Sequence, residues 1–143
     1  MPAHLDHTAV PAYDKQASAE FLAHILGLRV GTDPFGYFAP VELGNGVFLD
    51  FADSDDFRSG HYAFLVGEEE FDAAFARITE AGLDHHTGPS GTRGEIYFRD
   101  GGRGVYFDDP NGHVMELTTV PSSSIGPDTE IRTGPYEPAR GNE

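Results

Sequence analysis

Four residues of the sequence have side chains suited to metal chemistry and stand at related places in two similar segments. They are His7 and Asp50 in the first segment, and His61 and Glu116 in the second. Neutral imidazole and carboxylate are the usual ligands of divalent first-row metals. Two histidines and one carboxylate on one face would leave coordination positions open for water and substrate. Such a site supports Lewis-acid catalysis or oxygen activation.

The two segments, at about 5–52 and 61–119, form an internal repeat. Each opens with a short apolar run that contains one histidine, His7 or His61. Alignment of residues 46–50 with residues 112–116 places Asp50 at the position of Glu116. A lone histidine or glutamate in a strand is more often structural or solvated. Four polar residues in matching register are harder to explain in that way, and they favour a common site.

Each segment predicts one helix followed by strands. The first helix begins after Asp14, a candidate N-cap, and ends at Gly27; the second carries the stripe Phe71, Phe75 and Ile78 and ends at Gly82. The expected strands are 28–30, 37–43 and 47–52 in the first segment, and 83–86, 104–107 and 113–119 in the second, with an extra strand or loop at 94–99. This order predicts an α+β fold in which two βαβββ repeats form a curved mixed sheet around a cavity.

Side chains alternate between the two faces of a strand, and this places two of the candidate ligands. His61 shares a face with Ala63, whereas Tyr62 and Phe64 are suited to pack against a helix. By the same rule, Glu116 lies opposite its apolar neighbours in sequence. We therefore expect His61 and Glu116 to point to the cavity side of the sheet.

Composition limits the class of protein. The 143 residues suit one domain, at 1–120, followed by a Pro-, Gly- and Ser-rich tail at 121–143 without periodicity. The absence of cysteine excludes disulfides and thiol catalysis. A formal charge of −15 disfavours nucleic acid and anionic membranes as partners. No signal peptide or membrane span is apparent, so we expect a cytoplasmic protein.

Several other polar or aromatic residues could take part in a site, although a structural or surface role is commoner for residues of these types. His85 and His86 are adjacent, face opposite ways and are expected at the surface. Tyr97 is one of several aromatic residues that could line a pocket, although core packing is the commoner fate. Arg99 and Arg103 are scarce positive groups that could meet an anionic substrate.

The sequence resembles the vicinal oxygen chelate superfamily, which includes glyoxalase I, bleomycin-resistance proteins, fosfomycin-resistance enzymes and extradiol dioxygenases. Residues 5–10 and 25–28 carry part of the resemblance. Residues 104–117 (GVYFDDPNGHVMEL) carry most of it. The resemblance covers about 5–119 and excludes the tail.

The resemblance implies one divalent ion per cavity, Fe²⁺, Mn²⁺, Ni²⁺ or Zn²⁺, bound by His7, His61 and Glu116. It implies that Tyr106 faces the substrate and acts in catalysis. It also implies that Asp50 is a fourth ligand or a catalytic base. Because aspartate is one methylene shorter than glutamate, the base is favoured. The superfamily further implies a homodimer, in some members with a cavity built from both chains.

Departures from the individual families leave the reaction open. Extradiol enzymes have a histidine shortly before the 104–117 motif, where this chain has Tyr97, Phe98 and Arg99. Fosfomycin-resistance enzymes use lysine and serine side chains to bind a phosphonate, whereas this chain has no lysine after Lys15 and offers Arg99 and Arg103 instead. The function expected is a metal-dependent lyase, isomerase or dioxygenase that acts on a small oxygenated organic molecule. The alternative is a protein that sequesters an antibiotic in a dimer-interface cavity, as bleomycin-resistance proteins do.

Overall fold

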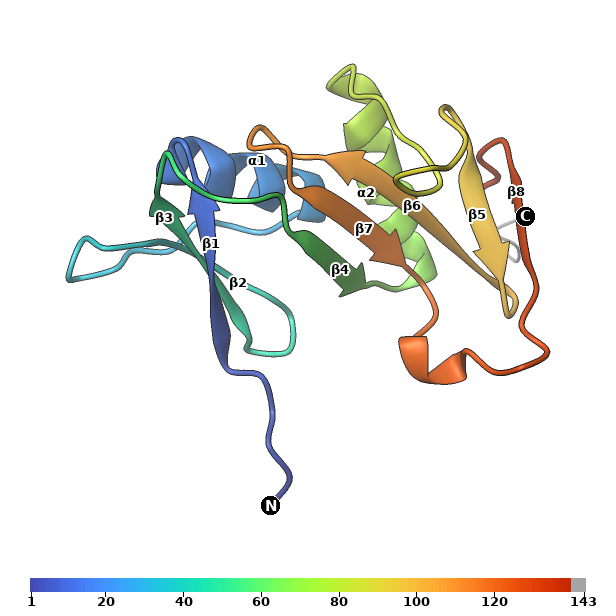
Figure 1. The fold of residues 1–143 in the computed structure, drawn as a ribbon, viewed down its shortest axis with the longest axis horizontal. Helices are drawn as coiled ribbons and strands as arrows, with labels where there is room; N and C mark the ends of the chain where they lie inside the picture. The colour runs from blue at the N-terminus through green and yellow to red at the C-terminus, as the bar shows by residue number, and fades with distance from the viewer. Residues whose placement is uncertain (140–143) are drawn as a thin grey trace. The chain divides into compact units, whose positions relative to one another are not determined.

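The computed structural model describes residues 1–139, which form two compact units. Unit 1 contains residues 1–59 and 109–111, and unit 2 contains residues 60–108 and the chain from 112 onward. Each unit has one α-helix and one mixed β-sheet (Figure 1). The α+β prediction is confirmed.

Unit 1 contains β1 (His7–Ala12), α1 (Lys15–Leu26), β2 (Ala39–Glu42) and β3 (Phe48–Asp53). The strand order is β1-β3-β2, with β1 parallel and β2 antiparallel to β3. Leu22 and Ile25 of α1 are buried, as are Val10, Val41 and Phe51 of the sheet. A single helix against a short sheet therefore supplies the apolar core of this unit.

The ends of α1 follow from local chemistry. The Asp14 carboxylate accepts a hydrogen bond from the Ala17 N–H, so it satisfies a donor that the first turn leaves unpaired. Gly27 ends the helix in the left-handed conformation, with φ 71°, which glycine adopts without steric cost. Both predicted caps are confirmed.

Unit 2 contains β4 (His61–Leu65), α2 (Glu68–Glu80), β5 (Ile96–Arg99), β6 (Gly102–Asp108), β7 (Val114–Thr118), the 3₁₀ turn η1 (Ser122–Ser124) and β8 (Ile131–Gly134). The strand order is β4-β7-β6-β5-β8. Only β4 and β7 run parallel. The helix α2 lies on one face of this sheet (Figure 1). Its Phe71, Phe75 and Ile78 are buried, as are Phe107, Met115 and Leu117 of the sheet.

The register of the strands repeats between the units. In unit 1, Ala9 of β1 is the Cα partner of Asp50 in β3. In unit 2, Ala63 of β4 is the partner of Glu116 in β7, so the two carboxylates occupy matching places. The alignment of Asp50 with Glu116 that the sequence suggests is therefore a feature of the fold.

Two expected strands are wrong. Residues 28–30 form only an isolated bridge between Val30 and Val41, and in 83–86 only His86 forms bridges, to Arg93 and Tyr106. Each segment follows a helix end and has only three or four residues. Length alone does not explain the difference, because β2, β5 and β8 also have four residues and form ladders. In the two wrong segments, Val30 and His86 are the residues that meet a strand, and each forms only isolated bridges.

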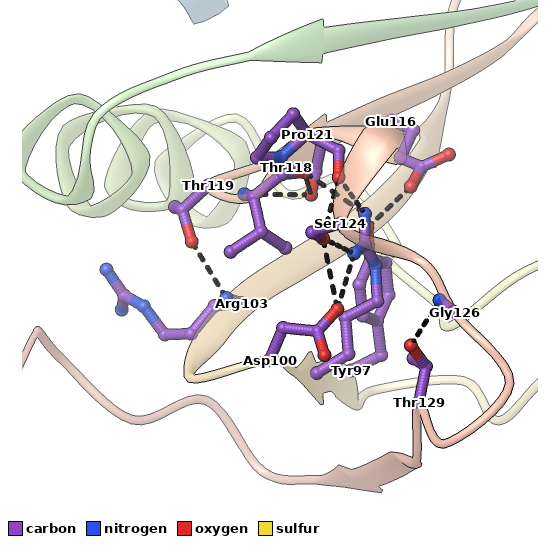
Figure 2. Close-up of polar contacts among 12 residues, drawn as sticks. Tyr97, Asp100, Arg103, Glu116, Thr118, Thr119, Pro121, Ser124, Gly126 and Thr129 are labelled. Atoms are coloured by element: carbon purple, nitrogen blue, oxygen red, sulfur yellow. Dashed lines mark hydrogen bonds and ion pairs between the residues drawn. The ribbon is translucent and has the colours of Figure 1, made fainter.

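The C-terminal segment has more structure than its composition predicts. The strand β8 pairs antiparallel with β5, and the Arg99 guanidinium donates to the Ser124 hydroxyl and to the Val120 carbonyl. Figure 2 shows this polar network around Asp100, Pro121 and Ser124. The segment is thus fastened to unit 2, although its Pro, Gly and Ser content masked the strand. No helix among residues 1–139 is long and apolar enough to cross a membrane.

Candidate active site

His61 and Glu116 lie side by side on the sheet face opposite α2. They come from the parallel neighbours β4 and β7, and His61 Nε2 is 2.9 Å from Glu116 Oε1. The imidazole is half exposed, whereas the carboxylate side chain is only 13% exposed. A partly buried carboxylate next to an accessible imidazole is suited to bind a ligand that arrives from solvent.

Tyr97 holds the other oxygen of the same carboxylate. Its hydroxyl donates to Glu116 Oε2 at 2.6 Å, and Figure 2 shows Tyr97 directed at Glu116. The tyrosine ring lies across β6 at Gly104, where an added Cβ would overlap the ring. Gly104 therefore permits the position of Tyr97, and Tyr97 fixes the orientation of Glu116.

Tyr106 completes the wall of this site. It is the Cα partner of Glu116, and its ring stacks on the His61 ring at 5.4 Å between centroids. Burial and the charge of Glu116 raise the pKa of Tyr106 to about 12. Burial and the hydrogen bond to Glu116 raise the pKa of Tyr97 as well. Both hydroxyls therefore keep their protons at neutral pH and can donate hydrogen bonds.

The His61–Glu116 pair fits a cation in donor type and in spacing. Two neighbouring ligands about 2.1 Å from a divalent ion are separated by about 3 Å when they subtend a right angle at it. The 2.9 Å between Nε2 and Oε1 matches that separation. The remaining carboxylate oxygen already has a hydrogen-bond donor, as the outer oxygen of a metal-binding carboxylate usually has.

His7 and Asp50 lie on adjacent strands of unit 1. His7 Nδ1 is 2.7 Å from Asp6 Oδ2, and the His7 side chain is 60% exposed. The hydrogen bond to Asp6 raises the pKa of His7, with a smaller contribution from the charge of Asp50. In each unit one histidine contacts one carboxylate, but the partner of His7 is Asp6 and not Asp50. Within residues 1–139, no group of three or more His, Cys, Asp or Glu side chains is arranged to hold a metal ion.

Two residues of this face were missed as site residues in the sequence. The sequence leaves Tyr97 between a pocket and the core, and it favours the surface for His86. The His86 ring lies 5.7 Å from the Tyr106 ring, and its side chain is only 16% exposed. Strand alternation places Tyr97 on the face of Glu116, and Gly104 as its cross-strand partner signals a ring that needs space. No comparable signal identifies His86.

A family model decides the classification of the chain. The model of the glyoxalase/bleomycin resistance protein/dioxygenase superfamily matches residues 4–117. The chain belongs to this superfamily. The resemblance seen in the sequence is confirmed.

Solved structures of the superfamily share the fold. The structure titled Oxidase ChaP-H2 is 53% identical, with a TM-score of 0.82, over 88% of this chain and 100% of that one. A glyoxalase/dioxygenase from Nostoc punctiforme is 28% identical, with a TM-score of 0.65, over 83% of this chain and 92% of that one.

A curated relative shows a shorter match. Metallothiol transferase FosB from Shouchella clausii (strain KSM-K16) is 36% identical over 59 residues, or 41% of this chain. That match spans 37% of the FosB chain, so it covers little more than a third of that enzyme.

Proposed function

We propose that this protein is a metal-dependent oxidase of the superfamily that acts on a small oxygenated organic molecule. The observation that carries the proposal is the His61–Glu116 pair, with its two ligand atoms 2.9 Å apart and the carboxylate oriented by Tyr97. The 53% identity to a protein named as an oxidase favours oxidation over the lyase or isomerase reaction.

His61 and Glu116 would hold the ion, with His7 as the third ligand that the family resemblance implies. Bound there, a divalent metal supplies Lewis-acid stabilisation of substrate oxyanions and, as iron, a route for electrons to dioxygen. Asp50 is proposed as a base near the bound substrate, because its side chain is short for direct ligation.

The protein's own groups prepare the site for an oxygenated substrate. Tyr97 occupies Glu116 Oε2, so that Oε1, which faces His61 Nε2, is the oxygen that would bind the ion together with the imidazole. The Tyr106 hydroxyl is protonated at neutral pH, as in any tyrosine, and would donate a hydrogen bond to a substrate oxygen that replaces Glu116 as its partner. The Tyr106 ring stacks on that of His61, and the two rings form one side of the proposed substrate site.

A phosphonate substrate, as fosfomycin enzymes use, is disfavoured by the two arginines nearest the motif. Arg103 points to the α2 side of the sheet, where it binds Glu68 and Asp72. The Arg99 guanidinium donates hydrogen bonds to Asp100, Ser124 and backbone carbonyls. Both side chains are buried, so neither offers a free cation to an anionic ligand.

Oxygen uptake tests the proposed reaction class. The protein would be loaded anaerobically with Fe²⁺ and mixed with catechol or 2,3-dihydroxynaphthalene in an oxygen electrode. We expect oxygen consumption that depends on protein, iron and probe, and that is abolished in Glu116→Ala. Probe binding that is equal with and without metal, with no oxygen uptake, would contradict the proposal and indicate sequestration instead.

A further inference from the structure

A cavity of about 500 Å³ lies in unit 2, and Gly88 of its lining is next to the Tyr106 ring. Its lining includes His86, Asp108 and Val114, the apolar Leu83 and Pro89, and Arg93. Asp108 and Val114 are cross-strand partners, and Tyr106 and Glu116 form the pair two residues further along the same ladder. Val114 and Glu116 share a strand face, so the cavity continues the face that carries Glu116.

The opposite end of this face is closed. Arg99 lies there, bound to Ser124 of η1 and to the Val120 carbonyl, while Thr118 donates to the same carbonyl. Thr118 and Ser124 of this network are labelled in Figure 2. A substrate with one end at Glu116 therefore has room to extend toward His86 and not toward Arg99.

His86 is held firmly and directs one ring nitrogen at the cavity. Its backbone exchanges two hydrogen bonds of 2.9 Å with Tyr106. Its Nδ1 is engaged by Gly88, whose carbonyl is at 2.9 Å and whose N–H is at 3.2 Å. The other ring nitrogen, Nε2, lies 3.5 Å from Asp108 Oδ1. This distance is too long for a strong hydrogen bond, so Nε2 and the carboxylate can both bind a ligand.

The geometry points to a hydroxyl-binding subsite formed by His86 and Asp108, which takes the distal hydroxyl of a flat, phenolic substrate. This inference rests on the proposed function, which places the oxygens of the other end at His61 and Glu116. It adds the substrate class: a polyhydroxylated aromatic molecule whose distal hydroxyl lies beyond the metal-binding oxygens.

A hydroxyl fits the two groups better than a charged group does. It can donate to the Asp108 carboxylate while it accepts from Nε2–H, or donate to Nε2 in the other tautomer. The Asp108 carboxylate would repel an anion, whereas the charge of Asp84 at the same cavity is balanced by its ion pair with Arg93. The rings of His61, Tyr106 and His86 follow one another at 5.4 and 5.7 Å, tilted by 27° and 34°, and offer a surface for a flat ring.

A pair of probes tests the subsite. The full-length protein, loaded with Zn²⁺ to prevent turnover, would be titrated with 2,3-dihydroxynaphthalene and with 2,3,6-trihydroxynaphthalene, and the affinities compared. The third hydroxyl is expected to improve binding about tenfold in the wild type. We expect this gain to vanish in His86→Ala and to fall in Asp108→Ala, with little change for the dihydroxy probe. His24→Gln, a change of an exposed histidine on α1, should keep the gain.

The outcomes separate the two proposals. If zinc and the dihydroxy probe bind but the third hydroxyl brings no gain, or the gain survives both variants, the subsite is wrong and the metal function stands. If the wild type binds no zinc by elemental analysis, the proposed function fails, and the subsite falls with it.

Discussion

At the scale of single residues, the Glu116 carboxylate receives a contact on each oxygen, from His61 and from Tyr97. A ligand held in this way loses little freedom when it binds an ion. Removal of an outer contact to a metal ligand typically weakens metal affinity 10- to 100-fold. Tyr97 is therefore a positioning residue of the proposed centre.

The first prediction concerns this contact. Tyr97→Phe keeps the ring over Gly104 but removes the hydrogen bond, so Zn²⁺ affinity should fall about 10- to 100-fold in a competition titration with a chelator dye. The melting temperature should change little. Tyr13→Phe, at an exposed tyrosine, serves as the control. Equal zinc affinity in Tyr97→Phe and wild type would show that Tyr97 has no role in metal binding.

Features that depend on neighbouring residues could be predicted from the sequence, whereas contacts across the sheet could not. Asp14 and Gly27 were predictable because capping depends on a few neighbouring residues. Tyr97 and His86 depend on partners across the sheet, namely Glu116 and Tyr106. A position within a strand gives the face of a side chain, but the hydrogen bonds it makes depend on register.

At the scale of elements, Arg103 joins α2, β6 and the C-terminal segment. Its guanidinium binds Glu68 and Asp72 of α2 and the Glu137 carbonyl, and it lies 4.4 Å from the centre of the Phe71 ring. Tyr136 stacks on Phe75 and donates to the same Asp72. One buried cation thus links three segments that are distant in sequence.

The second prediction follows from that burial. Arg103→Leu would leave Asp72 without its cation, and the free energy of unfolding should drop by about 2–3 kcal/mol, somewhat less than for a fully buried pair because the acids are partly exposed. Urea denaturation gives the value. Arg93→Ala breaks an exposed ion pair with Asp84 and should cost under about 1 kcal/mol. A similar loss in both variants would contradict the role of Arg103.

The third prediction concerns pH. Burial opposes ionisation of Asp72, but hydrogen bonds from Arg103, Tyr136 and the Ala139 N–H outweigh it and lower its pKa below 3.8. Because the folded pKa is the lower one, the stabilisation is present above pH 3.8 and is lost as pH falls through the folded value. The stability difference between wild type and Asp72→Asn should therefore shrink on acidification. A difference that is constant from pH 7 to pH 3 would oppose this.

The prediction of elements succeeded where periodicity was sustained and failed where it was short. Both helices and the strands near 48–53, 102–108 and 114–118 carry alternating or helical patterns. The strand β8 has no such pattern: its Ile131 and Thr133 are exposed, and it forms by pairing with β5. Edge strands of this kind depend on a partner that local sequence does not display.

At the scale of the whole molecule, the family and the repeat were readable from the sequence because both copies preserve register. The oligomeric state depends on how the edges of the two sheets are covered. Among residues 1–139, the sheet of unit 1 ends at β1 and β2 and that of unit 2 at β4 and β8, and the outer edge of β2 is covered only by the bridge from Val30 to Val41. Such edges favour association unless they are covered.

The fourth prediction is a homodimer. Light scattering at micromolar concentrations should give twice the chain mass of 15.5 kDa. The mass should be the same in 0.5 M salt. Each chain has a net charge of −15, and salt screens the repulsion between the two chains, so it should not dissociate the dimer. A monomer mass across the concentration range would contradict the assembly.

The central claim is that Glu116 and His61 bind a divalent metal, and elemental analysis tests it most directly. Protein purified without chelators should contain about one divalent ion per chain, and Glu116→Ala should lose most of it because a three-ligand site has no redundancy. Glu42→Ala, at an exposed glutamate of β2, should retain the metal. Full occupancy in Glu116→Ala, or no metal in the wild type after incubation with Fe²⁺ or Zn²⁺, would contradict the claim.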